Sequence, residues 1–212
     1  MKPIRIIAFV FILSLFFLNC KISINKTLYV NDGENVYSDV MTINGSIFVG
    51  SNCEVHGSCR TVNGVIEVGK YSKAEDLQSV NGSIRVAEDV YVRGDVEAVN
   101  GSISCDPDVK VKGKVVSVNG NIELQKTRVK RDVRTYNGHI SLLDSTIIYG
   151  NVIVKRTKGS FERRKPLKIE IRNGSIVEGD VIAEREDDNI ELVLSDGGRV
   201  MGDVENILVI EE

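Results

Sequence analysis

The chain repeats one short motif at a nearly constant interval. Each copy places Asn-Gly after a bulky residue and puts an isoleucine three positions after the asparagine. Steps of 18 or 19 residues separate the six asparagines, which are Asn44, Asn63, Asn81, Asn100, Asn119 and Asn137. Asn-Gly turns between short β-branched runs, repeated at such a period, are typical of a β-solenoid. We therefore expect an all-β fold, a single-stranded β-solenoid with 18–19 residues in each coil.

The residues after each asparagine alternate between apolar and mostly polar types. The first apolar column is unbroken and consists of Ile47, Ile66, Ile84, Ile103, Ile122 and Ile140. The second column, two residues further on, consists of Val49, Val68, Val86, Cys105, Leu124 and Leu142. Alternation of this kind predicts a half-buried strand. Each buried isoleucine should stabilise the fold by about 1.5–3 kcal/mol.

A second pattern, Val-x-Gly-Asp-Val, precedes the asparagine and continues to the end of the chain. Its apolar column runs from Val40 to Val204 and counts nine coils. Three short strands and three corners fit into each coil, so we expect a triangular parallel β-helix, about 40 Å long, with a dry aliphatic interior. We expect left-handed backbone angles at the Asn-Gly and Gly-Asp corners, and right-handed crossovers.

The first residues have the composition of an export signal. Lys2 and Arg5 supply positive charge before an apolar run from Ile6 to Leu18, which is short for a membrane span. The run leads to Phe17-Leu18-Asn19-Cys20, which resembles the lipobox of bacterial lipoproteins but departs from it at its first and third residues. The resemblance implies that Cys20 becomes the lipid-modified first residue of the mature chain. A cleaved secretory signal and an uncleaved anchor are the alternatives.

These features divide the chain into three parts. Residues 1–19 form the lipoprotein signal peptide, residues 20–35 a polar linker from the lipidated cysteine, and residues 36–212 the solenoid domain. The regular spacing breaks at residues 155–168, where we expect a basic loop that leaves the rod. Loops released from packing constraints often carry binding residues.

The polar columns have structural interpretations. We expect the asparagine amides to form a ladder of hydrogen bonds along the axis. Aspartates form a partial column, Asp39, Asp76, Asp95, Asp132, Asp180 and Asp203. We interpret each aspartate as a cap of its own corner, and calcium binding is the alternative.

Catalytic and metal-ligating residues are sparse. His56 and His139 fall at outward positions of distant coils, so they cannot share a metal and are expected on the surface. Acyltransferases with hexapeptide-repeat β-helices have coils of similar length, but this chain lacks their strict hexapeptide pattern. We therefore expect a protein that is not an enzyme and that has no metal and no cofactor.

The cysteines after Cys20 have a core interpretation. Cys59 and Cys105 occupy inward positions that valine or leucine fills in other coils, which predicts small core residues. Cys105 lies at least two coils from the other cysteines, beyond disulfide reach. Cys53 and Cys59 could form a bridge, which export would permit.

Basic residues provide the one candidate binding site. The twelve residues are Lys126, Arg128, Lys130, Arg131, Arg134, Lys155, Arg156, Lys158, Arg163, Arg164, Lys165 and Lys168. Because adjacent coils stack, their charges could merge into one positive patch for polyanions such as sulfated glycans, lipopolysaccharide phosphates or anionic lipid headgroups. The alternative is a solvated surface. The formal net charge of −3 argues against nucleic acid as the main partner.

The repeat columns resemble those of two families. Asp95-Val96-Glu97-Ala98-Val99-Asn100-Gly101-Ser102-Ile103 resembles the adhesin-like β-helix domains of bacterial envelope proteins. The Val-x-Gly-Asp-Val columns resemble bactofilins, polymer-forming cytoskeletal proteins with triangular right-handed β-helices. With the export signal, the first resemblance implies a non-enzymatic, lipid-anchored rod of the cell envelope, in the outer membrane on its periplasmic or surface face, that binds or displays a partner. The alternative is a self-assembling, bactofilin-like scaffold whose rods form homo-oligomers end to end.

Overall fold

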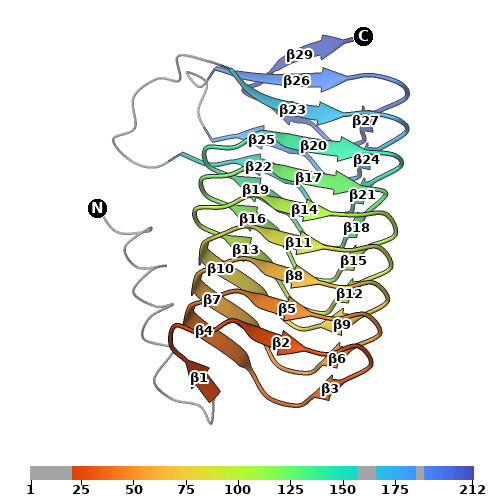
Figure 1. Ribbon diagram of the computed structural model, residues 1–212. Helices are drawn as coiled ribbons and strands as arrows, with labels where there is room; N and C mark the ends of the chain where they lie inside the picture. The colour runs from red at the N-terminus through yellow and green to blue at the C-terminus, as the bar shows by residue number, and fades with distance from the viewer. Residues whose placement is uncertain (1–20, 157–165, 185–188) are drawn as a thin grey trace.

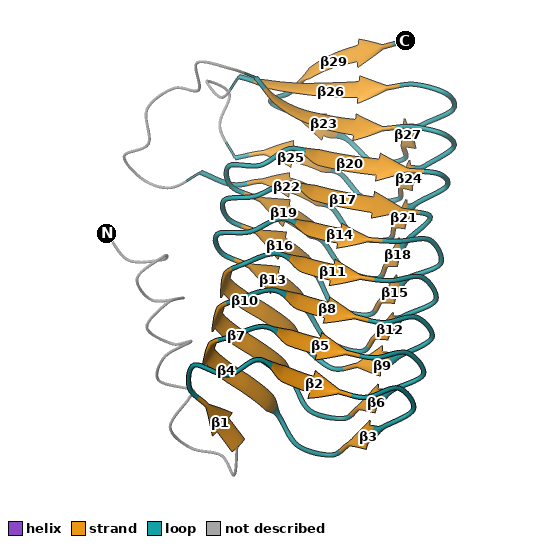
Figure 2. Cartoon of the chain, viewed as in Figure 1, coloured by secondary structure: helices purple, strands orange, loops and turns teal. Residues whose placement is uncertain are grey.

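The computed structural model describes residues 21–156, 166–184 and 189–212, and every regular element in these ranges is a β-strand (Figures 1 and 2). The strands form three parallel sheets, here called A, B and C, which are the three sides of a prism. The chain passes through A, B and C in turn in each coil. The sheets contain ten, ten and nine strands, so the described chain completes nine coils. The expected all-β solenoid of about nine coils is confirmed.

Each sheet takes one strand from each coil. Sheet A contains β1 (Lys21–Ser23), β4 (Val40–Asn44), β7 (Cys59–Asn63), β10 (Leu77–Asn81), β13 (Val96–Ala98), β16 (Val115–Ser117), β19 (Val133–Thr135), β22 (Val152–Val154), β25 (Val181–Ala183) and β28 (Val204–Glu205). Sheet B contains β2 (Leu28–Val30), β5 (Ile47–Val49), β8 (Ile66–Val68), β11 (Ile84–Val86), β14 (Ile103–Cys105), β17 (Ile122–Gln125), β20 (Ile140–Leu143), β23 (Leu167–Ile171), β26 (Ile190–Leu194) and β29 (Leu208–Glu211). Sheet C contains β3 (Asn35–Val36), β6 (Glu54–Val55), β9 (Lys73–Ala74), β12 (Tyr91–Val92), β15 (Lys110–Val111), β18 (Arg128–Val129), β21 (Ile147–Ile148), β24 (Ile176–Val177) and β27 (Arg199–Val200).

The described solenoid begins at Lys21 rather than at residue 36. β1 pairs with β4, β2 with β5 and β3 with β6, all in parallel. The segment expected as a linker therefore contributes a complete first coil. The Asn-Gly spacing did not reveal this coil because Asn25, its equivalent of the repeated asparagine, is followed by Lys26.

The apolar columns face the interior as expected. All six isoleucines of the first column are at most 1% exposed, and the column continues in register through Ile169 and Leu192. The second column, from Val49 to Leu142, is also buried. Outward residues such as Ser104 lie between the two columns and remain at least partly exposed. The alternation thus assigned the two faces of sheet B correctly.

The interior is not purely aliphatic, in contrast to our expectation. Buried hydroxyls, some of them on the strands of sheet A, satisfy backbone groups at two of the corners. Thr61 Oγ1 donates to the Gly45 carbonyl oxygen at 2.8 Å, and Thr146 Oγ1 accepts the Thr127 N–H at 3.1 Å. A buried carbonyl or N–H without a partner is costly, so a small hydroxyl is favoured over a methyl group at these positions.

The corners use glycine differently from our expectation. Left-handed backbone angles occur at the corner between sheets B and C, for example at Asn52 (φ 57°) and Asp108 (φ 66°). The Asn-Gly glycines do not have positive φ angles. Instead, each lies directly against the backbone of the preceding coil: a Cβ on Gly64 would overlap the carbonyl oxygen of Gly45. Close stacking of the coils therefore requires glycine at this corner.

The regular winding changes toward the C-terminal end. Two segments outside the described residues, 157–165 and 185–188, both connect sheet A to sheet B. Most of the basic loop expected at 155–168 lies outside the described residues, and its last two residues, Leu167 and Lys168, belong to β23. The last coil exposes large apolar side chains, namely Met201, Val204, Leu208 and Val209.

Candidate functional site

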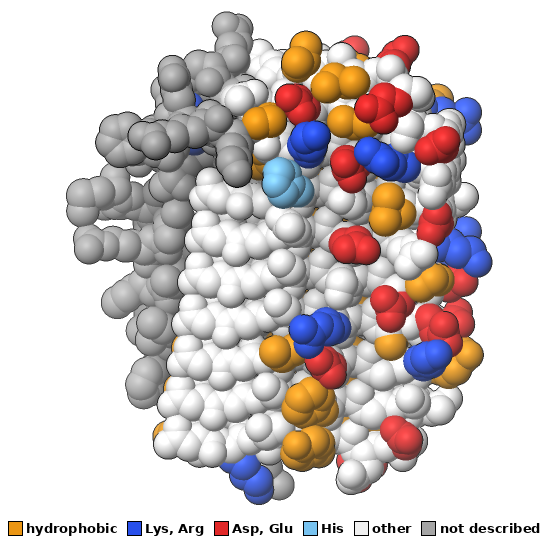
Figure 3. Space-filling model, turned by 45° about the horizontal axis from the view of Figure 1, so that its top comes forward, with side chains coloured by type: hydrophobic (Ala, Val, Ile, Leu, Met, Phe, Trp, Pro, Cys, Tyr) orange, Lys and Arg blue, Asp and Glu red, His pale blue; other side chains and the backbone are white. Residues whose placement is uncertain are grey.

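The asparagine column forms a continuous ladder. Asn44 Nδ2 donates to Asn25 Oδ1 at 2.8 Å, and Asn63 Nδ2 donates to Asn44 Oδ1 at 2.6 Å. The same bond joins each later pair up to Asn137, at 2.7–2.9 Å. The expected structural ladder is confirmed. Figure 3 shows a broad band of uncharged polar surface along the rod, next to a band with acidic and basic side chains.

The aspartate column links neighbouring coils. Asp76 Oδ1 accepts the Asp95 N–H, and Asp95 Oδ1 accepts the Lys114 N–H, both at 2.9 Å. Our expectation that each aspartate caps its own corner is therefore wrong, because the capped N–H belongs to the next coil. Lys114 Nζ also lies 3.6 Å from Asp95 Oδ2. Across the described ranges, no group of three or more His, Cys, Asp or Glu is placed to hold a metal ion.

Charged side chains on the outer faces form ion pairs between coils. Arg85 lies 2.6 Å from Glu67, its Cα partner on the neighbouring strand. Arg93 contacts both Glu54 and Glu75, and its hydrogen bond holds the pKa of Glu54 below the ordinary value. Opposite charges in register favour the stacking of coils. Ion pairs on the outer surface therefore connect neighbouring coils along the rod axis.

Four of the predicted basic residues lie on or beside sheet C. Arg128 and Lys130 point outward from β18 and the residue after it, and Arg131 is exposed at the following corner. Lys126, at the preceding corner, lies 2.9 Å from Asp108. This part of the predicted set therefore shares one side of the prism.

The other described members lie elsewhere. Arg134 and Lys155 belong to the sheet A side, where they pair with Asp132 and Glu184 respectively. Lys168 is on β23 of sheet B. Arg156 lies just after Lys155, and its N–H donates to Glu184 Oε2 at 3.3 Å. The described basic residues therefore occupy three sides and do not merge into one patch. Lys158, Arg163, Arg164 and Lys165 lie outside the described residues, as does Cys20.

The basic set predicted from the sequence omitted two lysines of sheet C. Lys110 is the Cα partner of Arg128, and Lys112 follows it on the same side of the prism, one coil before Lys130. They were missed because the basic set was delimited by its position along the chain. An alignment of the sheet C columns would have placed these lysines beside Arg128 and Lys130.

The histidines are exposed and lie on different coils, as expected. His56 stacks on Tyr37, with ring centroids 4.6 Å apart, and its Nε2 lies 3.8 Å from Glu54 Oε1. His139 Nδ1 accepts the Lys168 N–H at 2.9 Å. Both imidazoles therefore contact the neighbouring coils of the rod.

The cysteines in the described ranges are core residues. Cys53, Cys59 and Cys105 are buried and free, so the alternative of a Cys53–Cys59 bridge is not realised in this structure. Burial raises the pKa of both Cys59 and Cys105 to about 12. A thiol in this state is a poor nucleophile at neutral pH.

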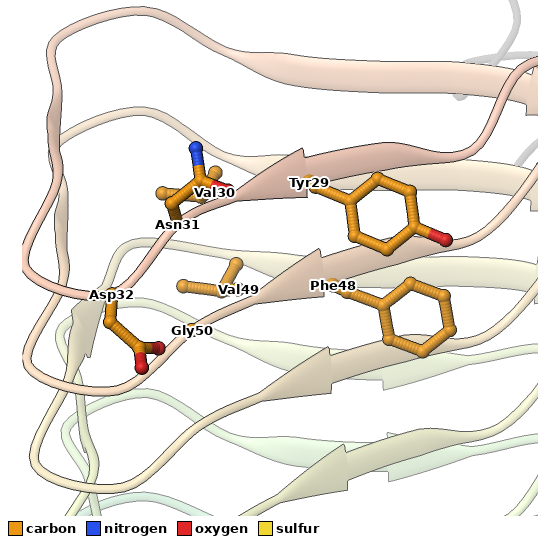
Figure 4. A pocket seen from close by; sticks show the side chains of 7 residues that line it. All are labelled: Tyr29, Val30, Asn31, Asp32, Phe48, Val49 and Gly50. Carbon is orange, nitrogen blue, oxygen red and sulfur yellow. The ribbon is translucent and has the colours of Figure 1, made fainter.

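A depression of about 560 Å³ lies beside the first two coils (Figure 4). The residues that line it are Tyr29, Val30, Asn31, Asp32, Phe48, Val49 and Gly50. The rings of Tyr29 and Phe48 project outward from β2 and β5 and stack at a centroid distance of 5.4 Å. Asp32 Oδ1 accepts the Ser51 N–H at 2.7 Å. That carboxylate therefore stabilises the corner of the next coil.

The fold and the surface place the protein in the structural class of three-sided parallel β-solenoids. Along the rod axis, asparagine hydrogen bonds and ion pairs connect successive coils. Comparison with known proteins found no matching family model, no matching curated protein and no matching solved structure. These comparisons therefore do not support the expected resemblance to adhesin-like or bactofilin repeats, and the fold itself is what the structure shows. No helix in the part of the chain that the structure describes is long and apolar enough to cross a membrane.

Proposed function

We propose that the protein is a non-enzymatic, lipid-anchored rod of the bacterial cell envelope, which binds or displays a partner along its sides. One observation carries the proposal: Lys21, the residue after Cys20, already belongs to β1 and pairs with Val40. A lipid on Cys20 would therefore be attached directly to one end of the rod. A solenoid held by its end presents three sides to the surroundings, with residues repeated about every 4.8 Å.

The anchor is tested by metabolic labelling with a palmitate analogue, followed by mass spectrometry of the membrane-extracted protein. We expect a diacyl or triacyl modification on Cys20 and accumulation of the precursor in the presence of globomycin. Cys20→Ser is the matched control and should lose both the label and the lipid-dependent membrane association. An unmodified mature N-terminus at another residue would overturn the proposal.

A second candidate function, a self-assembling scaffold, is favoured by the C-terminal coil. Val204, Leu208 and Val209 are exposed there by 36%, 63% and 41%, and β27, β28 and β29 end their sheets among the described residues. Open strand edges with apolar side chains invite pairing with another rod.

The scaffold function predicts concentration-dependent oligomers of the mature protein in detergent. Charging the end with Val209→Lys and Ile210→Lys should return the protein to a monomer in sedimentation experiments. Lys substitutions at the outward positions Ser104 and Ser141, in the middle of sheet B, provide the control. A strict monomer at high concentration would argue for the binding rod alone.

A further inference from the structure

On sheet C, basic residues from successive coils stack without a carboxylate between them in the described ranges. Arg93 precedes Lys112 in this stack but is ion-paired with Glu54 and Glu75, whereas the next two coils of the described chain carry unpaired cations. Lys110 and Arg128 are Cα partners on β15 and β18. Lys112 and Lys130 follow as a second stacked pair, because their N–H groups donate to Val92 and Val111, respectively, at equivalent positions. All four side chains are exposed, and none forms an ion pair among the described residues.

This arrangement departs from the rest of the charged surface. Elsewhere a basic residue usually faces an acidic one on the next coil, as in Arg85–Glu67 and Lys70–Glu88. Like charges directly opposite each other on neighbouring strands are destabilising. The four cations form a two-by-two array, spaced about 5 Å along the axis and about 7 Å along the strand. A ligand with closely spaced anionic groups would relieve their repulsion.

Tyrosine rings border the array at two diagonal corners. Tyr91 precedes Lys110 in one column, with Lys112 Nζ 5.7 Å from its ring centroid. Tyr149 follows Lys130 in the other column, with Lys130 Nζ 3.5 Å from its ring centroid. Both rings are only partly buried. The site thus combines four cations with two aromatic surfaces on one flat side of the rod.

We propose that Lys110, Lys112, Arg128 and Lys130, with Tyr91 and Tyr149, form a binding site for a sulfated or phosphorylated polysaccharide. The cations hold the sulfate or phosphate esters, and the tyrosine rings pack against the apolar faces of sugar rings. The site rests on the proposed binding function and names its ligand class. It differs from the basic set predicted along the chain by including the neighbouring coil and the two tyrosines.

The position of the array favours a polysaccharide over a lipid surface. The array lies on the fifth and sixth of nine coils. That position is about 20 Å along the axis from the first coil. The Debye length at physiological ionic strength is about 8 Å, so the headgroups of a membrane that holds the first coil act weakly at this distance. A linear polymer lying along the rod can contact the cations of both coils.

The experiment uses the full mature chain in detergent and measures binding to dextran sulfate, to a phosphorylated mannan and to neutral dextran. The site variant carries Lys110→Gln, Lys112→Gln, Arg128→Gln and Lys130→Gln. The control variant removes the same charge from ion-paired basic residues outside the predicted basic set, with Lys70→Gln, Arg85→Gln, Lys114→Gln and Arg172→Gln. Thermal unfolding establishes that both variants are folded.

We expect the site variant to bind the anionic polysaccharide about tenfold or more weakly, with a shallower dependence on salt, and the control variant to bind as the parent does. The double substitution Tyr91→Leu with Tyr149→Leu should weaken binding of the polysaccharide several-fold. The dextran sulfate and phosphomannan measurements distinguish the two esters.

Three results would overturn the site: no binding of either anionic polymer, an equal loss in the control variant, or a preference for phosphatidylglycerol vesicles that depends on the same four cations. Lipid labelling of Cys20, measured on the same samples, separates the outcomes. A labelled chain that does not bind refutes the site and leaves the anchored rod intact.

Discussion

Replacing Gly101 with alanine should destabilise the protein through contact between coils rather than through backbone angles. Gly101 is not among the residues with positive φ, so alanine can adopt its conformation. A Cβ at this position would overlap the carbonyl oxygen of Gly82 and would lie 2.9 Å from the Ser83 nitrogen. Both neighbours are backbone atoms of the preceding coil, and moving them would disturb the hydrogen bonds between coils.

The expected magnitude follows from two opposing effects. Overpacking of this kind costs about 1–3 kcal/mol, whereas the lower entropy of the unfolded alanine chain returns about 0.4–1 kcal/mol. The net loss for Gly101→Ala should be on the order of 1–2 kcal/mol. For a domain of this size each kcal/mol lowers Tm by about 2–4 °C, which urea and thermal unfolding followed by circular dichroism can resolve.

Gly174 provides the matched control. Its φ is +70°, and the nearest atom to an added Cβ would be Ser145 Oγ at 3.6 Å. Gly174→Ala should cost about 1 kcal/mol through conformation alone, and Gly174→Asn should recover most of that loss because asparagine tolerates left-handed angles. At Gly101, asparagine should be at least as harmful as alanine. A neutral Gly101→Ala, or a Gly101→Asn more stable than Gly101→Ala, would refute the stacking argument.

Three further predictions concern the core, the thiols and pH. Ile103→Asp should lower the free energy of unfolding by roughly 3 kcal/mol or more, whereas Ser104→Asp should be mild; equal losses in thermal unfolding would contradict the assigned faces. Cys59 and Cys105, whose thiol pKa is raised to about 12, should resist alkylation near neutral pH until the protein unfolds, and rapid labelling of the native protein would contradict their burial. Because the folded pKa of Glu54 is lowered, its contribution to stability is present above the unfolded pKa and is lost as pH falls through the folded value. Glu54→Gln should therefore reduce the acid-induced loss of Tm, and an unchanged pH profile would count against the Arg93 contact.

The sequence was sufficient for the architecture because the relevant signals are periodic. The isoleucine column repeats at the coil length, so its burial and the facing of Ser104 could be assigned without knowing the corners. The asparagine ladder followed from the same spacing, since equal steps bring equivalent amides next to each other along the axis. The positions of Cys59 and Cys105 in apolar columns likewise predicted their burial.

The features that were missed depend on distances between coils. The first coil was taken for a linker because Asn25 lacks the following glycine, although its amide accepts a hydrogen bond from Asn44. The Asn-Gly glycines were expected to supply left-handed backbone angles. They are required instead because the backbone of the preceding coil leaves no room for a side chain. Lys110 was overlooked because a patch on one side of a prism gathers residues from successive coils, and grouping by proximity along the chain cannot show this.

The most direct test of the continuous rod is amide hydrogen exchange of the full mature protein, followed by mass spectrometry. If the solenoid begins at Lys21 and its described coils stack without interruption, peptides covering the described strands from β4 to β26 should be strongly protected. Those covering β2 and β3 should exchange at least about tenfold more slowly than the unfolded chain. Exchange of residues 28–36 at the unfolded rate, or an unprotected coil between β7 and β21, would contradict the account.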